Sequence, residues 1–422
     1  MGVSEHRDST SRPPTIDSPT APIDVVLLGR QFGLPFGMAA TTRVTLLCRA
    51  LAYAGDNVSI LVTQVSEYPP DVRNTQCRGS VGGIPFEYTN GTTVRAASFL
   101  MRRLVEWRGI AVAIRRLASL RRSRRPVAIL AYMDTSQWSL AYLVLTASAR
   151  ALRMPVVLQL CELPWTMKGR PRPWERMLSP LVFTNGAVTI SRHLTDWANA
   201  QYASRKSRAG ATQVPILVDA DEVRASPYPQ TTQSAVYAVS SAYDRDLAFV
   251  LEAMQHVWDS QPRCRLMVTG IAPLELERHL KALGFDAPET HSVEGLGWIS
   301  RDALLQLYTG SSVCLAPLFD DERSIARFPT KIGEYLAAAR PVVTSSIGEV
   351  ARYLEDATTA YLAAPGDAPA FGRKIVEVLS DPEHAAAVGA RGRQLAEQQF
   401  DYRVHASKLH EALSRASSGR TW

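Results

Sequence analysis

The chain has 422 residues, of which 46% are hydrophobic and 21% are charged, and its formal net charge is +7. This composition excludes a disordered chain, a collagen and a coiled coil, and the length predicts about two or three domains. The five cysteines are scattered without a C-x-x-C pair, which argues against a disulfide framework or a cysteine-based zinc site. Buried single cysteines are typical of a reducing compartment, so we expect a cytoplasmic protein.

The first elements of the chain predict a tail followed by a β-α-β unit. Residues 1–21 are polar and rich in serine, threonine and proline, so we expect a disordered tail. A strand at residues 23–28, a helix at 41–54 and a strand at 58–62 follow. In the loop between the first strand and the helix, Gly33 and Gly37 permit close backbone approach, and the helix start offers free N–H groups to an anion.

The positive charge is concentrated in residues 95–125, which hold ten arginines and one glutamate, a net charge of +9. Apolar residues recur there at helical spacing: Leu100, Leu104, Trp107, Ala111, Ile114 and Leu117. Gly109 lies inside this stripe, so two short helices are an alternative to one. The arginines that flank the stripe include Arg102, Arg103, Arg115, Arg116, Arg121 and Arg122.

This arginine-rich segment has three interpretations. It is a candidate contact with an anionic membrane surface, where each basic residue contributes on the order of 1 kcal/mol. The alternative is an ordinary surface helix whose apolar stripe packs inward. Nucleic acid is a third interpretation, but Trp107 is the single aromatic residue of the patch, and single-strand binders use a series of stacking rings. We therefore expect no nucleic-acid partner, and a location on the inner face of the cell membrane stays open.

The remaining elements alternate in the same way. Strands are predicted at residues 127–132, 155–160, 188–190, 235–239, 265–269, 313–316, 341–344 and 359–362. Helices are predicted at 139–152, from 192, and at 246–258, 301–309, 331–339, 368–380 and from 383. No apolar run is long enough to cross a bilayer.

Repeated β-α units predict an α/β fold of two Rossmann-like, doubly wound domains, with the ligand in the cleft between them at the carboxyl ends of the strands. The domains are expected at 22–213 and 225–395. Residues 214–224 would form the hinge between them. Residues 396–422 are expected to form a helix that crosses back to the N-terminal domain.

The segment at residues 327–344 reads RFPTKIGEYLAAARPVVT and has the chemistry of a nucleotide site. Pro329 and Thr330 begin a helix whose first turn carries Lys331 and Glu334. The free N–H groups of that turn and the lysine suit a diphosphate, and the carboxylate accepts two hydrogen bonds from a ribose. A capped helix with a glutamate in its first turn is the alternative.

This segment resembles the donor-binding signature of GT-B retaining glycosyltransferases of the group 1, family 4 type. Other pieces that are similar to the family follow in its order between residues 22 and 415: VTIS at 188–191, VPILVD at 214–219, RLMVTG at 265–270, GLGWI at 295–299 and QFDY at 399–402. The resemblance implies the GT-B fold and the transfer of a sugar, with retention, from a nucleoside diphosphate donor of the UDP or GDP type. The domain at 225–395 would bind this nucleotide-sugar, and the domain at 22–213 would bind the acceptor.

The resemblance also implies roles for individual residues. Glu162, in CELP at 161–164, would face the reacting sugar, while Lys331 and Arg245 would neutralise the departing diphosphate. Donor contacts would come from Gly33, Gly37, Trp298, Ile299, Arg327, Pro329, Thr330 and Glu334. No Asp-x-Asp pair lies in a strand-end loop, so we expect no metal and no cofactor besides the nucleotide-sugar co-substrate. The expected acceptor is a glycan, a natural-product precursor or a lipid-linked molecule.

Three departures from the family pattern keep other functions open. Ala326 lies eight positions before Glu334, where the family places an acidic residue. Ser240 and Ser241 replace the usual arginine, and no histidine lies at the family's catalytic histidine position. A sugar-nucleotide epimerase and a non-catalytic glycosyltransferase-like partner subunit are therefore the alternatives.

Overall fold

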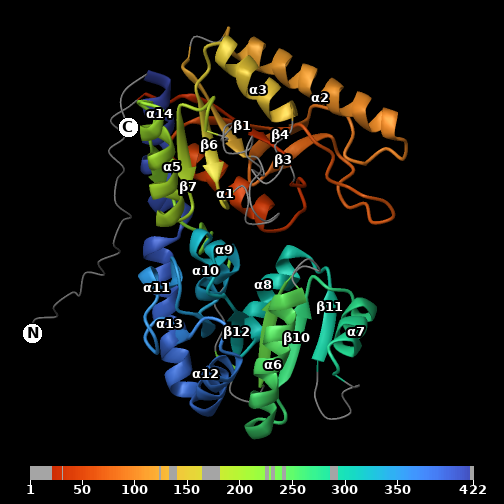
Figure 1. The fold of residues 1–422 in the computed structure, drawn as a ribbon, viewed down its shortest axis with the longest axis vertical. Helices are drawn as coiled ribbons and strands as arrows, with labels where there is room; N and C mark the ends of the chain where they lie inside the picture. The colour runs from red at the N-terminus through yellow and green to blue at the C-terminus, as the bar shows by residue number, and fades with distance from the viewer. Residues whose placement is uncertain are drawn as a thin grey trace, which may run out of the picture.

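The computed structural model describes residues 21–30, 32–122, 125–132, 140–163, 181–223, 228–229, 233–239, 244–285 and 293–418. Several sequence predictions lie outside these residues: the tail at 1–20, Arg124, Pro164, Ser240 and Ser241. The chain folds into two α/β domains, one above the other in Figure 1, each built on one sheet. No helix of the described residues is long and apolar enough to cross a membrane.

The N-terminal domain is built on an eight-stranded sheet. Its strands, in order across the sheet, are β3 (Arg78–Val81), β4 (Ile84–Tyr88), β2 (Asn57–Val62), β1 (Asp24–Gly29), β5 (Val127–Tyr132), β6 (Val156–Leu160), β7 (Gly186–Thr189) and β8 (Ala211–Gln213). Every pair is parallel except the β3–β4 hairpin. All six residues of β1 are buried, because helices cover both faces of the sheet. These helices include α1 (Ala39–Tyr53), α2 (Phe99–Leu120), α3 (Leu140–Ala151) and α5 (Arg192–Ser204).

The C-terminal domain is built on a six-stranded, fully parallel sheet. Its order is β11 (Val293–Gly297), β10 (Arg265–Thr269), β9 (Ser234–Ala238), β12 (Val313–Ala316), β13 (Val342–Ser345) and β14 (Tyr361–Ala363). The helices are α6 (Asp244–Ser260), α7 (Pro273–Ala282), α8 (Arg301–Gly310), α9 (Glu322–Ala326), α10 (Thr330–Ala337), α11 (Val350–Tyr353), α12 (Ala368–Ser380) and α13 (Pro382–Gln399). Numbered within this domain, the strand order is 3-2-1-4-5-6. Successive strands are added on one side of β9 and then on the other, so the topological switch point lies between β9 and β12. The predicted fold of two Rossmann-like sheets is confirmed.

The chain passes between the domains twice, along the same path. After α13 it turns back to the N-terminal domain as a short 3₁₀ helix, η1 (Tyr402–His405), and α14 (Ala406–Ser418), which lies near α5 in Figure 1. The two passages pair with each other, because the Val218 N–H donates to the Phe400 carbonyl at 2.9 Å and the Tyr402 N–H donates to the Val218 carbonyl at 3.0 Å. On α14, His410 Nδ1 lies 2.9 Å from both carboxylate oxygens of Asp56, which fixes the helix to the N-terminal domain.

The arginine-rich segment forms one helix, α2, so the alternative of two short helices is wrong. Gly109 does not divide it: a Cβ there would lie 2.9 Å from the Cβ of Asn90, so the glycine allows the helix to approach the loop after β4. The alternative that the apolar stripe packs inward is wrong in part, because Leu100, Leu104 and Trp107 are exposed. The helix buries its face only from Gly109 onward, where the loop and the sheet lie beneath it.

Candidate functional site

The carboxyl ends of the two sheets face each other. Trp298 follows β11, and the guanidinium carbon of Arg73, which follows β2 in the other domain, lies 4.1 Å from the centre of its ring. Ser191 follows β7, and its hydroxyl donates to the carbonyl of Ala326, at the end of α9, at 2.5 Å. The loops that carry the predicted donor residues therefore lie at the boundary between the domains, where open α/β sheets bind ligands.

Lys331 lies in the first turn of α10, beside the end of β9. Its Nζ donates to the Ala238 carbonyl at 2.9 Å and lies 4.6 Å from the centre of the Tyr237 ring. Burial is the main cause that lowers the pKa of Lys331 to about 8; Asp246 opposes this shift, and Arg327 adds to it. No side chain caps α10, whose N-cap residue is Pro329, so the capped-helix interpretation is wrong. The lysine and the uncapped helix start point to a site for an anion.

Positive charge surrounds Asp246, which lies in the first turn of α6. Burial raises the pKa of Asp246, against the lowering influence of Lys331, Arg327, Arg323 and Arg245. A cluster of four cations around one carboxylate leaves excess positive charge between α6, α9 and α10, which suits a diphosphate. The sequence analysis did not predict Arg323, because the donor-binding motif gives no indication of the short helix α9 on which it lies.

Arg245 has a partner of its own in this cluster. Its Nη1 lies 3.0 Å from the Asp321 carboxylate, and its guanidinium carbon lies 3.7 Å from the centre of the Phe319 ring. Asp321 also accepts from the Ser324 N–H and so caps α9. The arginine side chain is 65% exposed and joins α6 to α9 at the edge of the site. Arg245 thus lies near Lys331, the other residue predicted to meet the diphosphate charge, and its own charge is shared with Asp321.

Glu334 is only 6% exposed and is held by an arginine that the sequence analysis missed. Arg301, the first residue of α8, donates from Nη1 to Glu334 Oε1 at 2.5 Å and from Nε and Nη2 to the two oxygens of Glu222, both at 3.1 Å. Burial opposes the charge of Arg301, but Glu334 and Glu222 together raise its pKa. No described residue donates to Glu334 Oε2, so one oxygen of a fixed carboxylate remains for a ligand.

The glycines of the loop after β1 are required by the loop itself. A Cβ on Gly37 would lie 1.9 Å from Thr41 Oγ1, and a Cβ on Gly33 would lie 2.7 Å from the Phe36 carbonyl. The Asn74 side chain holds the same loop, accepting from the Phe36 N–H at 2.9 Å and donating to its carbonyl at 2.8 Å. The loop is therefore rigidly shaped.

The other predicted residues occupy neighbouring positions. Glu162 follows β6 and interacts electrostatically with Tyr132 and Cys161, on the N-terminal side of the boundary. Ile299 and the half-exposed Trp298 follow β11. Arg327, Pro329 and Thr330 lead into Lys331. The structure brings Lys331, Arg327 and Arg245 together around Asp246, and it places Glu334 on the same short helix as Lys331.

The arginines predicted for a membrane surface lie elsewhere, along α2 and just after it. Arg103 pairs with Glu106 at 2.8 Å, Arg116 pairs with Glu87 at 3.0 Å, and Arg121 donates to the Leu152 carbonyl at 3.2 Å. The others of this set are Arg102, Arg115 and Arg122. This patch is separate from the cation cluster of the C-terminal domain.

Comparison with known proteins agrees with this geometry. Residues 234–381, from β9 to the end of α12, match the family described as "Glycosyl transferases group 1". The matched residues include the cation cluster, Arg301 and Glu334. No match is found among curated protein sequences.

Solved structures share the fold of the whole chain. Anabaena HepE, crystallised with UDP and glucose, is 15% identical, with 93% of this chain and 99% of that chain covered and a TM-score of 0.63. Sucrose-phosphate synthase from Thermosynechococcus elongatus is 16% identical, with 94% and 100% covered and a TM-score of 0.65. The lipopolysaccharide outer core galactosyltransferase WaaB is 12% identical, with 94% and 99% covered and a TM-score of 0.55. At these identities, the likeness establishes the GT-B fold.

Proposed function

We propose that this chain is a glycosyltransferase that moves a sugar from a nucleoside diphosphate donor, of the UDP or GDP type, to an acceptor held by the N-terminal domain. The observation that carries the proposal is the cation cluster around Asp246, at the point where the C-terminal sheet reverses, within a group 1 glycosyltransferase domain. HepE, with the same fold, binds UDP and glucose, so UDP is the first donor base to test.

The proposed mechanism uses charge and not a metal. Lys331, with Arg327, Arg323 and Arg245, meets the charge that develops as the diphosphate departs, aided by the start of α10. Glu334 holds the ribose through its unpaired oxygen. Trp298 and Ile299 flank the base. Glu162 faces the transferred sugar from the N-terminal side, and we propose retention, as in family 4.

For the acceptor we propose a glycan or a lipid-linked molecule. Residues 95–125 carry a net charge of +9, and five of the ten arginines of this segment lie on α2 of the N-terminal domain. An anionic membrane surface would attract this patch. A location on the inner face of the cell membrane follows from that proposal.

The two alternatives predict different behaviour. An epimerase needs a pair of acid–base groups near the sugar, and of these the sequence offered only Glu162. It would convert the donor without any acceptor. A non-catalytic partner subunit keeps the fold, and Ala326, buried beneath Ser191, is the departure that favours it. That subunit would neither hydrolyse nor transfer the donor sugar.

A thermal melting panel with UDP, GDP and ADP tests nucleotide binding and identifies the base. A ligand at a hundred times its dissociation constant stabilises the folded state by about 2.7 kcal/mol. We expect UDP or GDP to raise Tm and ADP to raise it less. Mass spectrometry of the products formed from the matching sugar donors, with polyprenyl-phosphate-linked acceptors, then identifies transfer. If none of the nucleotides raises Tm, the proposal fails.

The lowered pKa of Lys331 predicts how donor binding depends on pH. Below about pH 8 the amine is protonated and attracts the diphosphate; above it, binding must first return the proton. UDP affinity should therefore be nearly constant below about pH 7, be about twofold lower at pH 8, and fall by up to about tenfold for each further pH unit. Isothermal titration calorimetry measures this, and Lys331→Ala, which has no amine to titrate, should show a flat profile. A falling profile in that variant would assign the effect to another group.

A further inference from the structure

The first turns of α2 expose a row of large apolar side chains. They are Phe99, Leu100, Met101, Leu104 and Trp107, and their exposed fractions run from 44% for Trp107 to 75% for Leu100. Scattered single apolar residues are normal on a surface, but five within nine residues of one helix form a patch, and such patches mark interaction sites. In the part of the chain that the structure describes, nothing covers this patch.

Cations lie directly against this apolar patch. The guanidinium carbons of Arg102 and Arg103 lie 5.9 Å and 5.2 Å from the centre of the Phe99 ring. Arg95 precedes the helix, and Arg108 follows Trp107. Glu106 is the one acid of the segment, and it is neutralised by Arg30 at 2.7 Å and by Arg103 at 2.8 Å. An apolar face with a cationic border matches the boundary between lipid headgroups and acyl chains.

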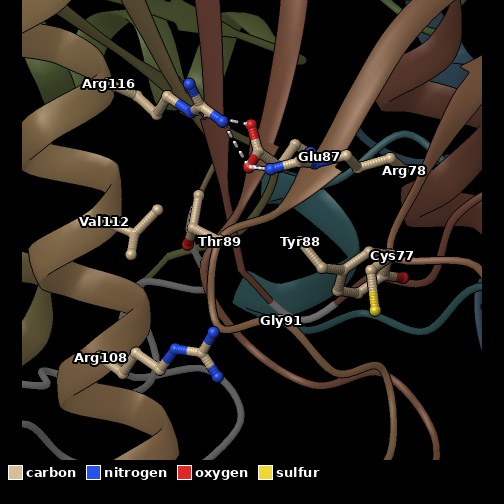
Figure 2. Close-up of a pocket in the computed structure, with 9 residues that line it drawn as sticks. All are labelled: Cys77, Arg78, Glu87, Tyr88, Thr89, Gly91, Arg108, Val112 and Arg116. Carbon is tan, nitrogen blue, oxygen red and sulfur yellow. Dashed lines mark hydrogen bonds and ion pairs between the residues drawn. The ribbon is translucent and has the colours of Figure 1, made fainter.

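A groove runs between α2 and the β3–β4 hairpin, beside the patch. Figure 2 shows its first part, a cavity of about 460 Å³. At one end of this cavity, Glu87 lies 2.7 Å from Arg78 and 3.0 Å from Arg116. At the other end, Arg108 points toward Gly91, and it forms no ion pair with any described residue. A second cavity of about 510 Å³ continues the groove on the far side of the Arg78–Glu87–Arg116 group.

We propose that α2 docks on an anionic phospholipid membrane: its apolar patch enters the interface, and the cavity beside Arg108 receives a lipid phosphate. Three arginines and one carboxylate line this cavity, so it carries excess positive charge. Arg108, which pairs with no acid in the described part of the chain, is the one that lies closest to the patch along the helix. An apolar protein partner for the patch would not neutralise the positive charge of the cavity. A bilayer satisfies the apolar and the cationic features together.

Docking would also orient the enzyme. The ion pair between Arg30 and Glu106 joins α2 to the loop after β1, the loop assigned to the acceptor side. A membrane bound at α2 would therefore bring that loop close to the bilayer, where a lipid-linked acceptor arrives by lateral diffusion. This consequence rests on the proposed function, whereas the docking itself does not.

Vesicle sedimentation of the full chain tests the proposal with three single variants. Leu104→Asp should lower the partition coefficient on vesicles of phosphatidylcholine with phosphatidylglycerol by about tenfold or more, because burial of a leucine is lost. Arg108→Gln should lower it about fivefold, the effect of one headgroup-bound cation. Leu274→Asp is the matched control: this leucine is 60% exposed on α7 of the other domain, and its replacement should change nothing. Tm of each variant, measured with and without UDP, shows that the variants fold and bind donor.

The outcomes distinguish headgroup binding, apolar insertion and self-association as explanations of the patch. Two results would support a phosphate site. Binding to vesicles of phosphatidylcholine alone should be weak, and glycerol phosphate should compete with the vesicles whereas chloride at equal ionic strength should not. Wild-type partitioning of Arg108→Gln would overturn the headgroup site, and wild-type partitioning of Leu104→Asp would overturn insertion. A wild-type dimer that Leu104→Asp converts to a monomer would assign the patch to a second copy and overturn the proposal. Because donor binding is measured without vesicles, failure of docking leaves the proposed function standing.

Discussion

Replacing Lys331 with alanine is expected to lower kcat about 100- to 1,000-fold, the usual loss when one group that stabilises transition-state charge is removed. The amine lies at the end of β9, hydrogen bonded to the Ala238 carbonyl and within the cation cluster around Asp246. Burial destabilises the charged amine in the free enzyme, and the negative charge of the leaving diphosphate offsets this destabilisation. The effect should therefore be larger on kcat than on donor affinity, since the charge of the diphosphate grows as the bond to the sugar breaks.

Steady-state kinetics with the donor identified in the melting panel measures this split. Lys281→Ala is a suitable control, because Lys281 lies on α7 with a 64% exposed side chain and, among the described residues, pairs only with its neighbour Glu277 at 2.8 Å. Its kcat should equal that of the wild type. A Lys331→Ala enzyme with normal turnover would remove the lysine from the mechanism and leave the charge to Arg327, Arg323 and Arg245.

The central strands were predictable because they are almost entirely apolar; β1 has one charged residue, Asp24, at its start. β1 and β5 are short apolar runs buried within a parallel sheet, and their boundaries in the structure differ from the predicted ones by at most one residue. The β3–β4 hairpin was missed, because RGSV and IPFEY contain glycine, proline and charge in place of an apolar run. The buried face of α2 could not be predicted from the sequence either, because it depends on where the loop at Asn90 passes beneath Gly109.

The candidate site was predictable only where its residues are adjacent in sequence. Lys331 and Glu334 lie in one motif on one helix, so the pattern indicated both. Arg301 lies 33 residues before Glu334, and Glu222 lies in the segment between the domains. The sequences around Arg301 and Glu334 do not indicate this ion pair, because it forms only when the start of α8 packs against α10. The environment of the predicted carboxylate is thus a tertiary property.

Replacing Glu334 with alanine should weaken UDP binding about 10- to 100-fold, the range for hydrogen bonds to a charged group. The variant should also lose about 1–2 kcal/mol of unfolding free energy, less than for a fully buried pair, because Arg301 keeps Glu222 as a partner. Urea denaturation measures the second effect and calorimetry the first. Glu222→Gln provides the matched control: it removes the other partner of Arg301 and should lower stability while UDP affinity changes little.

The 2′-hydroxyl separates a direct contact from a structural effect of Glu334. If Glu334 Oε2 accepts from the ribose, as proposed, the wild type should bind UDP more tightly than 2′-deoxy-UDP. Glu334→Ala should bind the two nucleotides equally, whereas Glu222→Gln should keep the preference. Arg301→Gln frees the carboxylate to rotate, so its preference should shrink without vanishing. If Glu334→Ala still prefers UDP, the ribose contact is wrong, and the carboxylate serves to hold α8 against α10.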